Sequence, residues 1–482
     1  MKISKIISII ISITVLLAVW FAPSEIFGIR NLSVIEQRVI AVFCFAAIMW
    51  VAEAVPIWTT SVLTIVILIL TISDSSLWFF RGTSAAFDGA REFGTFIKYK
   101  ALMATFADPI IMLFLGGFFL AIGAGKCGLD KNLARVLFKP FGTNSKTVLL
   151  GLMFVTAIFS MFMSNTATTA MMFAVMAPLL VPMEDSGKGR IALVLAIPIA
   201  ANIGGIGTPI GTPPNAIALK YLNDHDGLNL GIGFGQWMAV MVPFVIVMMF
   251  AAWLMLSKLF PFKRKTLEVV FEGKFQKNRK AYIVYATFAV TVVLWILDNF
   301  TGVNANVVAM IPMAVFSVTG IVDKNDLKTI NWDVLWLVAG GFALGVALHD
   351  TGLAKNLVDS IPFATWSPFM TIVGAGVLCY LMSTFMSHTA TSALLVPVLA
   401  TVATGMGDSL LPYGGVPTLL VGVALSASLA MALPISTPPN AIAHSAGLTT
   451  QKQMAVIGVS VGVIGLSVGY LLLFVLGLVK YF

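Results

Sequence analysis

The chain has 482 residues, of which 59% are hydrophobic and only 10% are charged, and its mean hydropathy is +0.98. Soluble globular chains carry about 25% charged residues, so this composition excludes a soluble globular protein. The net charge of +8 does not indicate a nucleic-acid partner, because the positive residues cluster between the apolar runs, where they set the orientation of membrane spans. The apolar runs are continuous rather than alternating, which predicts an all-α polytopic membrane protein surrounded by lipid.

Eleven apolar runs have about the length needed to cross a bilayer, roughly 20 residues. In chain order they lie at 5–23, 36–56, 58–73, 109–127, 190–219, 235–257, 281–298, 303–321, 333–350, 415–445 and 453–479. The first run resembles the apolar region of a signal peptide, but no small-residue cleavage site follows it. We therefore expect this run to be retained as the first span.

Two further apolar regions, 145–183 and 366–404, are interrupted by polar motifs that are nearly identical. The first motif is "FMSNTATTA" at 162–170, and the second is "FMSHTATSA" at 385–393. The two halves of each region are too short to cross a bilayer comfortably. We expect both regions to be re-entrant hairpins that enter and leave on the same side, with the motif at the tip.

The distribution of positive charge predicts the orientation of the spans. With the N terminus inside, 20 of the 29 Lys and Arg residues fall in cytoplasmic segments and nine fall outside. This bias predicts a multi-pass protein of the plasma (inner) membrane with a cytoplasmic N terminus and an external C terminus.

The chain also repeats itself at an almost constant offset. "GGFFLAIGAGKCGLDKNL" (116–133) matches "GGFALGVALHDTGLAKNL" (340–357) at an offset of 224, and "GTPPNAIA" (211–218) matches "STPPNAIA" (436–443) at 225. Four predicted crossings separate the first GGF span from the second, so the two copies point in opposite directions. Inverted repeats with interrupted helices are typical of secondary transporters, whose binding site lies where the copies meet.

Each T-P-P-N motif interrupts a predicted span, because two prolines cannot continue a helix. The break frees backbone carbonyls, which can coordinate Na⁺, and creates a helix N terminus, which attracts anions. No Asp, Glu, Lys or Arg lies in 191–219, 366–407 or 409–451, so bound sodium would have to balance an anionic substrate. A single Ser/Thr cluster more often joins helices, and a single Pro is usually a kink, but duplication of both motifs favours a site. Two matching half-sites suit a dicarboxylate.

The paired tips and paired "TPPNAIA" breaks resemble the divalent-anion:sodium symporter family, which includes sodium-coupled dicarboxylate transporters. The resemblance covers essentially the whole chain. It implies a homodimer that works by an elevator mechanism, in which a transport domain slides against a scaffold. The corresponding division is scaffold at 1–140 and 258–365, and transport domain at 141–257 and 366–482.

By motif position, the resemblance also implies the ligand contacts. Substrate would contact Ser164, Asn165, Thr166, Thr212, Ser387, His388, Thr389, Thr437 and Pro438. A first sodium ion would be held by Ser160, Ser164, Asn165 and Gly211, and a second by Ser383, Met386, His388 and Ser436. The sodium-coupled members carry Asn at the position of His388. A ring nitrogen is a poor ligand for Na⁺, so we expect one sodium fewer than in Asn-bearing relatives.

The resulting hypothesis is secondary transport of dicarboxylates such as succinate, malate or fumarate, coupled to sodium. His388 leaves two alternatives within transport: a sodium-independent dicarboxylate exchanger and a proton-coupled transporter. An anion channel is an alternative of another class. We do not expect an enzyme, because the sequence has neither a metalloprotease motif nor a nucleophile elbow.

Overall fold

The computed structural model describes residues 3–81, 92–180, 188–223, 228–269, 275–479 and 481. Within these ranges the chain is helical, and its only β-type pairings are two isolated bridges. Ten stretches of the described chain are long and apolar enough to cross a membrane, and four shorter apolar helices accompany them. The prediction of an all-α polytopic membrane protein is confirmed.

The helices of the first half match the predicted runs closely. They are α1 (Ile3–Phe21), α2 (Val34–Ala52), α3 (Ile57–Ile72), α4 (Tyr99–Ala104), α5 (Pro109–Lys126), α6 (Leu129–Phe138), α7 (Ser145–Phe162), α8 (Asn165–Leu180), α9 (Gly189–Gly205), α10 (Pro213–Asn223) and α11 (Phe234–Leu259). The predicted hairpin at 145–183 is the pair α7 and α8, and its last residues, 181–183, lie outside the described residues.

The helices of the second half follow the same order. They are α12 (Arg279–Ile296), α13 (Asp298–Thr301), α14 (Ala305–Val308), α15 (Met310–Val318), α16 (Trp332–Asp350), α17 (Leu353–Ser360), α18 (Pro368–Phe385), α19 (His388–Met406), α20 (Gly415–Leu429), α21 (Pro438–Ser445) and α22 (Gln451–Leu478). The series α16–α22 repeats the series α5–α11: a long helix, a short helix, a hairpin pair, a broken pair and a long helix. This order agrees with the duplication seen in the sequence.

Local sequence signals explain where the helices begin. Ser33 and Glu36 form a reciprocal capping box at the start of α2, which satisfies two backbone N–H groups that the helix leaves unpaired. The Asp108 carboxylate accepts from Ile110 N at the start of α5, where Pro109 occupies the first turn. Proline suits that position because no hydrogen bond is lost there.

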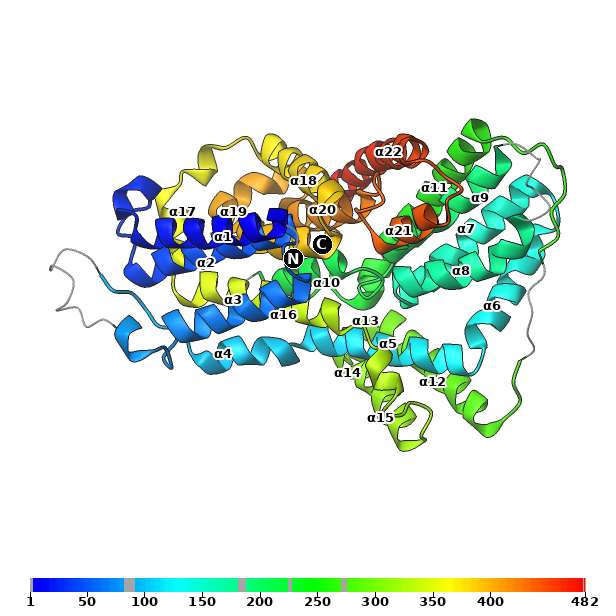
Figure 1. Ribbon diagram of the computed structural model, residues 1–482, viewed down its shortest axis with the longest axis horizontal. Helices are drawn as coiled ribbons and strands as arrows, with labels where there is room; N and C mark the ends of the chain where they lie inside the picture. The colour runs from blue at the N-terminus through cyan, green and yellow to red at the C-terminus, as the bar shows by residue number, and fades with distance from the viewer. Residues whose placement is uncertain are drawn as a thin grey trace.

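The two copies interlock through their broken helices. In the first copy, α10 packs against α19 and α20 of the second, and α21 of the second copy packs against α8 and α9 of the first. Figure 1 shows α7, α8 and α9 in the right half of the molecule, α17 and α19 in the left half, and α10 between them. Each broken helix thus packs against the hairpin of the opposite copy, while each hairpin tip contacts the break of its own copy through Ser160 and Ala201 O in the first copy and through His388 and Ala430 O in the second.

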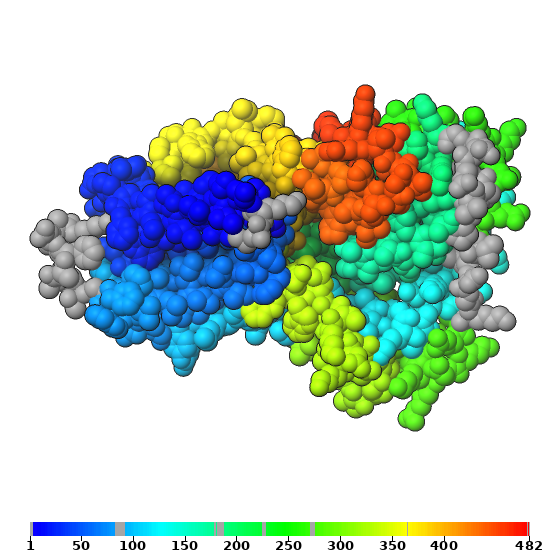
Figure 2. All heavy atoms as spheres, in the orientation of Figure 1, coloured from blue at the N-terminus to red at the C-terminus, as the bar shows by residue number. Residues whose placement is uncertain are grey.

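The remaining helices pack around these interlocked helices. Across the copies, α3 packs against α16 and α5 packs against α15, and α1 covers α2. Figure 2 shows the N-terminal helices (blue) on the left of one face and the first-copy helices (cyan and green) on the right, with the C-terminal segment (orange to red) between them.

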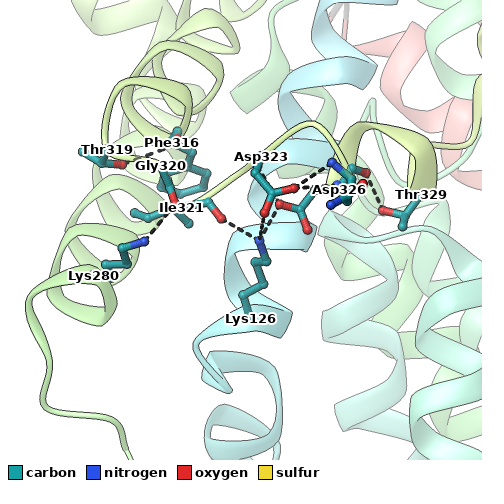
Figure 3. Close-up of polar contacts among 10 residues, drawn as sticks. Lys126, Lys280, Phe316, Thr319, Gly320, Ile321, Asp323, Asp326 and Thr329 are labelled. Carbon is teal, nitrogen blue, oxygen red and sulfur yellow. Dashed lines mark hydrogen bonds and ion pairs between the residues drawn. The ribbon is translucent and has the colours of Figure 1, made fainter.

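A charged cluster joins the end of α5 to the segment between α15 and α16 (Figure 3). The Lys126 ammonium donates to Ile321 O at 2.9 Å and to the Asp326 carboxylate, and it lies 3.6 Å from the Asp323 carboxylate. The backbone N–H groups of Asn325 and Asp326 hold the pKa of the Asp323 carboxyl below its ordinary value. Asp323 is therefore charged at neutral pH and helps to hold Lys126 in place.

Candidate functional site

A cavity of about 410 Å³ lies where the two hairpin tips meet the two breaks. All nine residues that the resemblance implies as substrate contacts line it: Ser164, Asn165, Thr166, Thr212, Ser387, His388, Thr389, Thr437 and Pro438. Two residues of the implied sodium sites, Gly211 and Ser436, also line it, whereas Ser160, Ser383 and Met386 lie buried behind the tips. Equivalent residues 223 or 225 positions apart in the chain thus contribute to one cavity.

Four helices of the hairpins and the breaks begin at this cavity, because Asn165, Pro213, His388 and Pro438 are the first residues of α8, α10, α19 and α21 and all line it. Each helix N terminus is equivalent to roughly +0.5 elementary charge, so the four together offer about +2. No Lys or Arg is among the lining residues, and the charged side chain among them is Asp333 of α16. The site can therefore attract a dianion without any positively charged side chain.

The two tips have the same local geometry. Ser164 Oγ accepts from Ala167 N at 3.2 Å, and Ser387 Oγ accepts from Ala390 N at 3.1 Å, so each serine caps the helix that follows it. This cap places Thr166 and Thr389 in the first helical turn. Within the described part of the chain, neither threonine hydroxyl has a protein hydrogen-bond partner, and both side chains line the cavity. Both hydroxyl protons are free to bind a ligand.

The asparagine of each T-P-P-N motif stabilises the break, a role that the sequence analysis did not predict. Asn215 Nδ2 donates to Gly205 O at 3.0 Å and to Thr208 O at 2.8 Å. In the second copy, Asn440 Nδ2 donates to Met431 O at 2.8 Å and to Leu433 O at 3.0 Å. These amides satisfy backbone carbonyls that are left without a helical partner where the helix is interrupted. The duplicated Asn was visible in the sequence, but its partners were not.

The first implied sodium site is a compact group of oxygens. Ser160 Oγ lies 2.5 Å from Asn165 Oδ1 and 2.7 Å from Ala201 O. One hydroxyl proton thus serves two acceptors, and surplus oxygen lone pairs suit a hard cation. A Cβ added to Gly205 would lie 2.8 Å from Asn165 Oδ1 and 3.0 Å from Gly211 O. The glycine leaves open the space where these oxygens converge, which fits the chemistry of a Na⁺ site.

The corresponding space in the second copy is filled by side chains. Alanine and serine replace the two glycines, as Ala430 and Ser436, and His388 replaces Asn165. The imidazole is only 8% exposed, and its Nε2 lies 2.8 Å from Ala430 O. A carbonyl only accepts, so Nε2 carries the proton and donates. The second implied set therefore offers an N–H donor at a place where a cation would need an oxygen.

The two breaks use different residues for the same hydrogen bonds. Thr208 Oγ1 donates to Met161 O at the end of α7 and accepts from Gly211 N at 3.1 Å. Ser436 Oγ donates to the corresponding carbonyl, Thr384 O, at 2.6 Å and accepts from Leu433 N at 3.2 Å. The hydroxyl has moved three positions along the chain between the copies. Ser436 uses its proton in this contact and has less to offer a cation.

Sequence reasoning missed other lining residues. Asn202 and Asp333 were not singled out, because each stands alone in or at the start of an apolar run. A second cavity, of about 490 Å³, is lined by polar residues that include Asn223, Asp298 and Asn306, and it contains none of the implied contacts.

Comparisons with known proteins agree with this geometry. Residues 47–416 match the citrate transporter family (CitMHS). The sodium-dependent dicarboxylate transporter SdcS of Staphylococcus aureus is 30% identical over 91% of this chain and 86% of its own length. The chain belongs to the divalent-anion:sodium symporter family.

Other members and fold relatives extend the comparison. The inorganic phosphate transporter PHO87 of Saccharomyces cerevisiae is 28% identical over 85% of this symporter-family chain, which spans 43% of that protein's length. The solved structure of the YdaH transporter of Alcanivorax borkumensis superposes with a TM-score of 0.54 at 13% identity, covering 78% of this chain and 87% of that one. The latter likeness shows the fold alone. Relatives of this chain are thus named for different substrates, inorganic phosphate and dicarboxylate.

Proposed function

We propose that the protein is a secondary active transporter that moves C4 dicarboxylates, such as succinate, malate or fumarate, together with sodium. The observation that carries the proposal is the convergence of four helix N termini, two from each copy, on one cavity whose lining has no Lys or Arg. The free hydroxyls of Thr166 and Thr389 come from opposite copies and would each donate to one carboxylate. The name of the relative SdcS supports both the substrate class and the co-ion.

Sodium would bind at the group formed by Ser160, Ser164, Asn165 and Gly211. The surplus of oxygen acceptors around Ser160 and the convergence of the Asn165 and Gly211 oxygens beside Gly205, which has no Cβ, support this position. In the second copy, the Nε2–H of His388 would replace the cation in satisfying Ala430 O. We therefore expect a single coupled sodium ion, which also explains why the chain can lack Asn at position 388.

The proposed function also implies an orientation of the protein in the membrane and a mode of movement. With the N terminus inside, as the positive charges favour, the start of α3 at Ile57 and the start of α16 at Asp333 lie on the cytoplasmic side. Both line the 410 Å³ cavity, so this conformation of the plasma-membrane protein is open to the cytoplasm.

Residues 141–257 and 366–482 would move as a transport domain against a scaffold of 1–140 and 258–365 in a homodimer.

The test is uptake of labelled succinate by purified protein in liposomes, with and without an inward sodium gradient. Sodium-stimulated uptake into vesicles that contain no dicarboxylate is expected. Uptake that ignores sodium but requires internal succinate would identify an exchanger, and uptake that follows an imposed proton gradient alone would identify proton coupling. An anion conductance far above the turnover of a carrier would identify a channel.

A further inference from the structure

Asn202 connects the two copies at the cavity and belongs to neither motif. It lies in α9 of the first copy, and its side chain is 1% exposed. Its Nδ2 donates to Thr437 Oγ1 at 3.2 Å and to Asn440 Oδ1 at 3.3 Å, and both of these residues belong to the break of the second copy. The residue at an offset of 225 is Ala427, so the second copy has no equivalent amide at that position.

The orientation of this amide follows from its neighbours. Asn440 donates through Nδ2 to Met431 O and Leu433 O, which are acceptors only. Its Oδ1 must therefore face Asn202. An acceptor in that place requires an N–H group from Asn202, so the Asn202 amide presents nitrogen, and not oxygen, to the second copy.

The contact determines what the Thr437 hydroxyl can do. Thr437 Oγ1 accepts from Asn202 Nδ2 at 3.2 Å and from Asn440 N at 3.2 Å. Two accepted bonds occupy both lone pairs of the oxygen, so the hydroxyl proton is left to be donated elsewhere. Thr437 lines the cavity, and a carboxylate in the cavity is the acceptor that suits this proton.

The same segment of α9 contacts the proposed sodium site. Ala201 O, one residue before Asn202, accepts from Ser160 Oγ at 2.7 Å, and Ser160 also shares its proton with Asn165 Oδ1. When a cation takes the Asn165 oxygen as a ligand, the Ser160 proton is left to Ala201 O alone. Cation binding would then strengthen the bond that holds α9 at residues 201 and 202.

We propose that Asn202 is a positioning residue that couples cation binding at Ser160 and Asn165 to carboxylate binding at Thr437. The path runs from the first copy to the second through two hydrogen bonds and one peptide unit. This inference rests on the proposed function, because it assumes that sodium and a dicarboxylate occupy these two places. It makes Asn202 the residue through which sodium raises the affinity for substrate.

The experiment measures the coupling itself, as the ratio of the succinate dissociation constants of purified protein without and with sodium, by calorimetry. Coupling free energies between sites typically correspond to ratios of about 5 to 150. The variants are N202A, which removes the amide, N202L, which keeps its volume, and N202S, which keeps one donor. A matched control is S428A, since Ser428 is 1% exposed in the other broken helix, α20, and its hydroxyl has no hydrogen-bond partner within the described chain.

The expected result is a ratio near 1 in N202A and N202L, an intermediate ratio in N202S, and the wild-type ratio in S428A. A merely structural role would weaken binding equally with and without sodium, and the ratio would stay at the wild-type value. That outcome in any of the three variants that remains folded and binds succinate overturns the inference. Wild-type protein whose succinate affinity ignores sodium would instead overturn the proposed function, so the two failures are distinguishable.

Discussion

The hydroxyl groups of Thr166 and Thr389 are available to bind an anion, because neither is used in a hydrogen bond within the described part of the chain. Each lies in the first turn of a helix whose preceding serine provides the cap, so the cap does not consume the threonine hydroxyl. Thr389 is only 9% exposed, and a hydrogen bond formed in such a place competes little with water. The two residues should therefore contribute strongly to substrate affinity.

Replacing either threonine by valine keeps the shape of the side chain and removes its donor. A hydrogen bond to a charged group contributes about 1.5–3 kcal/mol, so T166V and T389V should each weaken succinate binding about 10- to 150-fold. Calorimetry on purified protein measures this change. Normal succinate affinity in both variants would mean that the tips do not hold the substrate.

Replacing Gly205 by alanine, which adds one methyl group, tests the proposed sodium site. In G205A the new Cβ would lie 2.8 Å from Asn165 Oδ1, in the space that a cation needs. We expect the sodium concentration for half-maximal uptake to rise more than about tenfold, a loss of at least 1.4 kcal/mol. The control is G374A, whose new Cβ meets nothing within 4 Å. Unchanged sodium dependence in G205A would remove the site from this place.

At the scale of elements, the two helix breaks share the same arrangement of the chain but differ in the side chains around it. The first break has no Cβ at Gly205 and Gly211, so that oxygens converge there, whereas the second has Ala430, Ser436 and the ring of His388 at the equivalent positions. Both breaks keep the amide that caps the freed carbonyls and the hydroxyl that holds the hairpin. The difference between the copies is therefore confined to the residues around a possible cation.

Because the two breaks differ at few positions, the residues of the first break can be introduced into the second copy by substitution. The variant H388N/A430G/L433T/S436G gives the second copy the residues of the first at all four positions, including the hydroxyl that moves. Because the Hill coefficient can rise to the number of sites, we expect that of sodium-dependent uptake to rise from about 1 toward 2. H388N alone should leave it near 1, since Ala430 still fills the space. A coefficient of 2 in the wild-type protein would contradict the single-sodium proposal.

A partly buried ion pair joins two helices that the elevator model assigns to different domains. The Lys220 ammonium of α10 contacts the Asp108 carboxylate before α5, and it lies 4.2 Å from the ring centroid of Phe342. The two side chains are 20% and 11% exposed. The pair has to separate if α10 moves relative to α5.

Removing one member leaves the other charge without compensation, which for a partly buried pair should cost more than the ~1 kcal/mol of an exposed pair and less than the ~3–5 kcal/mol of a fully buried one. K220M and D108N should therefore each lower the melting temperature of the purified protein, while the double variant D108N/K220M should lie closer to the wild type. The double-mutant cycle on thermal unfolding measures the coupling. Additive losses would show that the two groups act independently.

At the scale of the molecule, the two cavities lie toward opposite ends of equivalent helices. Asp333, near the start of α16, lines the 410 Å³ cavity, whereas Ile110, near the start of the equivalent helix α5, lines the 490 Å³ cavity with Asn299. Inverted copies place these helix starts on opposite sides of the membrane. The cavity that reaches the tips should therefore open to one side only in this conformation.

Labelling with an impermeant thiol reagent tests this sidedness. The native thiols Cys44, Cys127 and Cys379 are free and would first be replaced by serine. D333C should then react in inside-out vesicles and N299C in right-side-out vesicles, and succinate should protect D333C. Reaction of both from one side would contradict the inverted arrangement.

Much of this architecture could be predicted from the sequence, because its signals are local. Composition predicts helices in lipid, two prolines interrupt a helix wherever they stand, and the constant offset of the motifs reveals the duplication. The implied substrate contacts line one cavity for the same reason, since they belong to short motifs that the duplication pairs. Their roles as ligand contacts remain predictions.

The rest depends on contacts between distant segments. Asn202 stands in the apolar run "IPIAANIGG" without a counterpart in the other copy, and only the packing of α9 against α21 shows that it reaches Thr437. The exchange of Gly205 for Ala430 was present in the sequence as well. Its meaning required the distance from an added Cβ to the Asn165 oxygen.

The filled space in the second copy has an electrical consequence. Helix dipoles carry no net charge, so a dicarboxylate held by them and accompanied by one sodium ion crosses the membrane with a net charge of −1. Moving that charge inward against an inside-negative potential costs about 2.3 kcal/mol per 100 mV, while a tenfold sodium gradient supplies about 1.4 kcal/mol. A dicarboxylate complex with one sodium ion is thus driven outward by an inside-negative potential. A complex with two sodium ions would carry no net charge, and the potential would not affect its movement. If the protein moves a dicarboxylate with one sodium ion as proposed, the imidazole N–H in place of a second cation would make the membrane potential a determinant of the direction of net dicarboxylate flow.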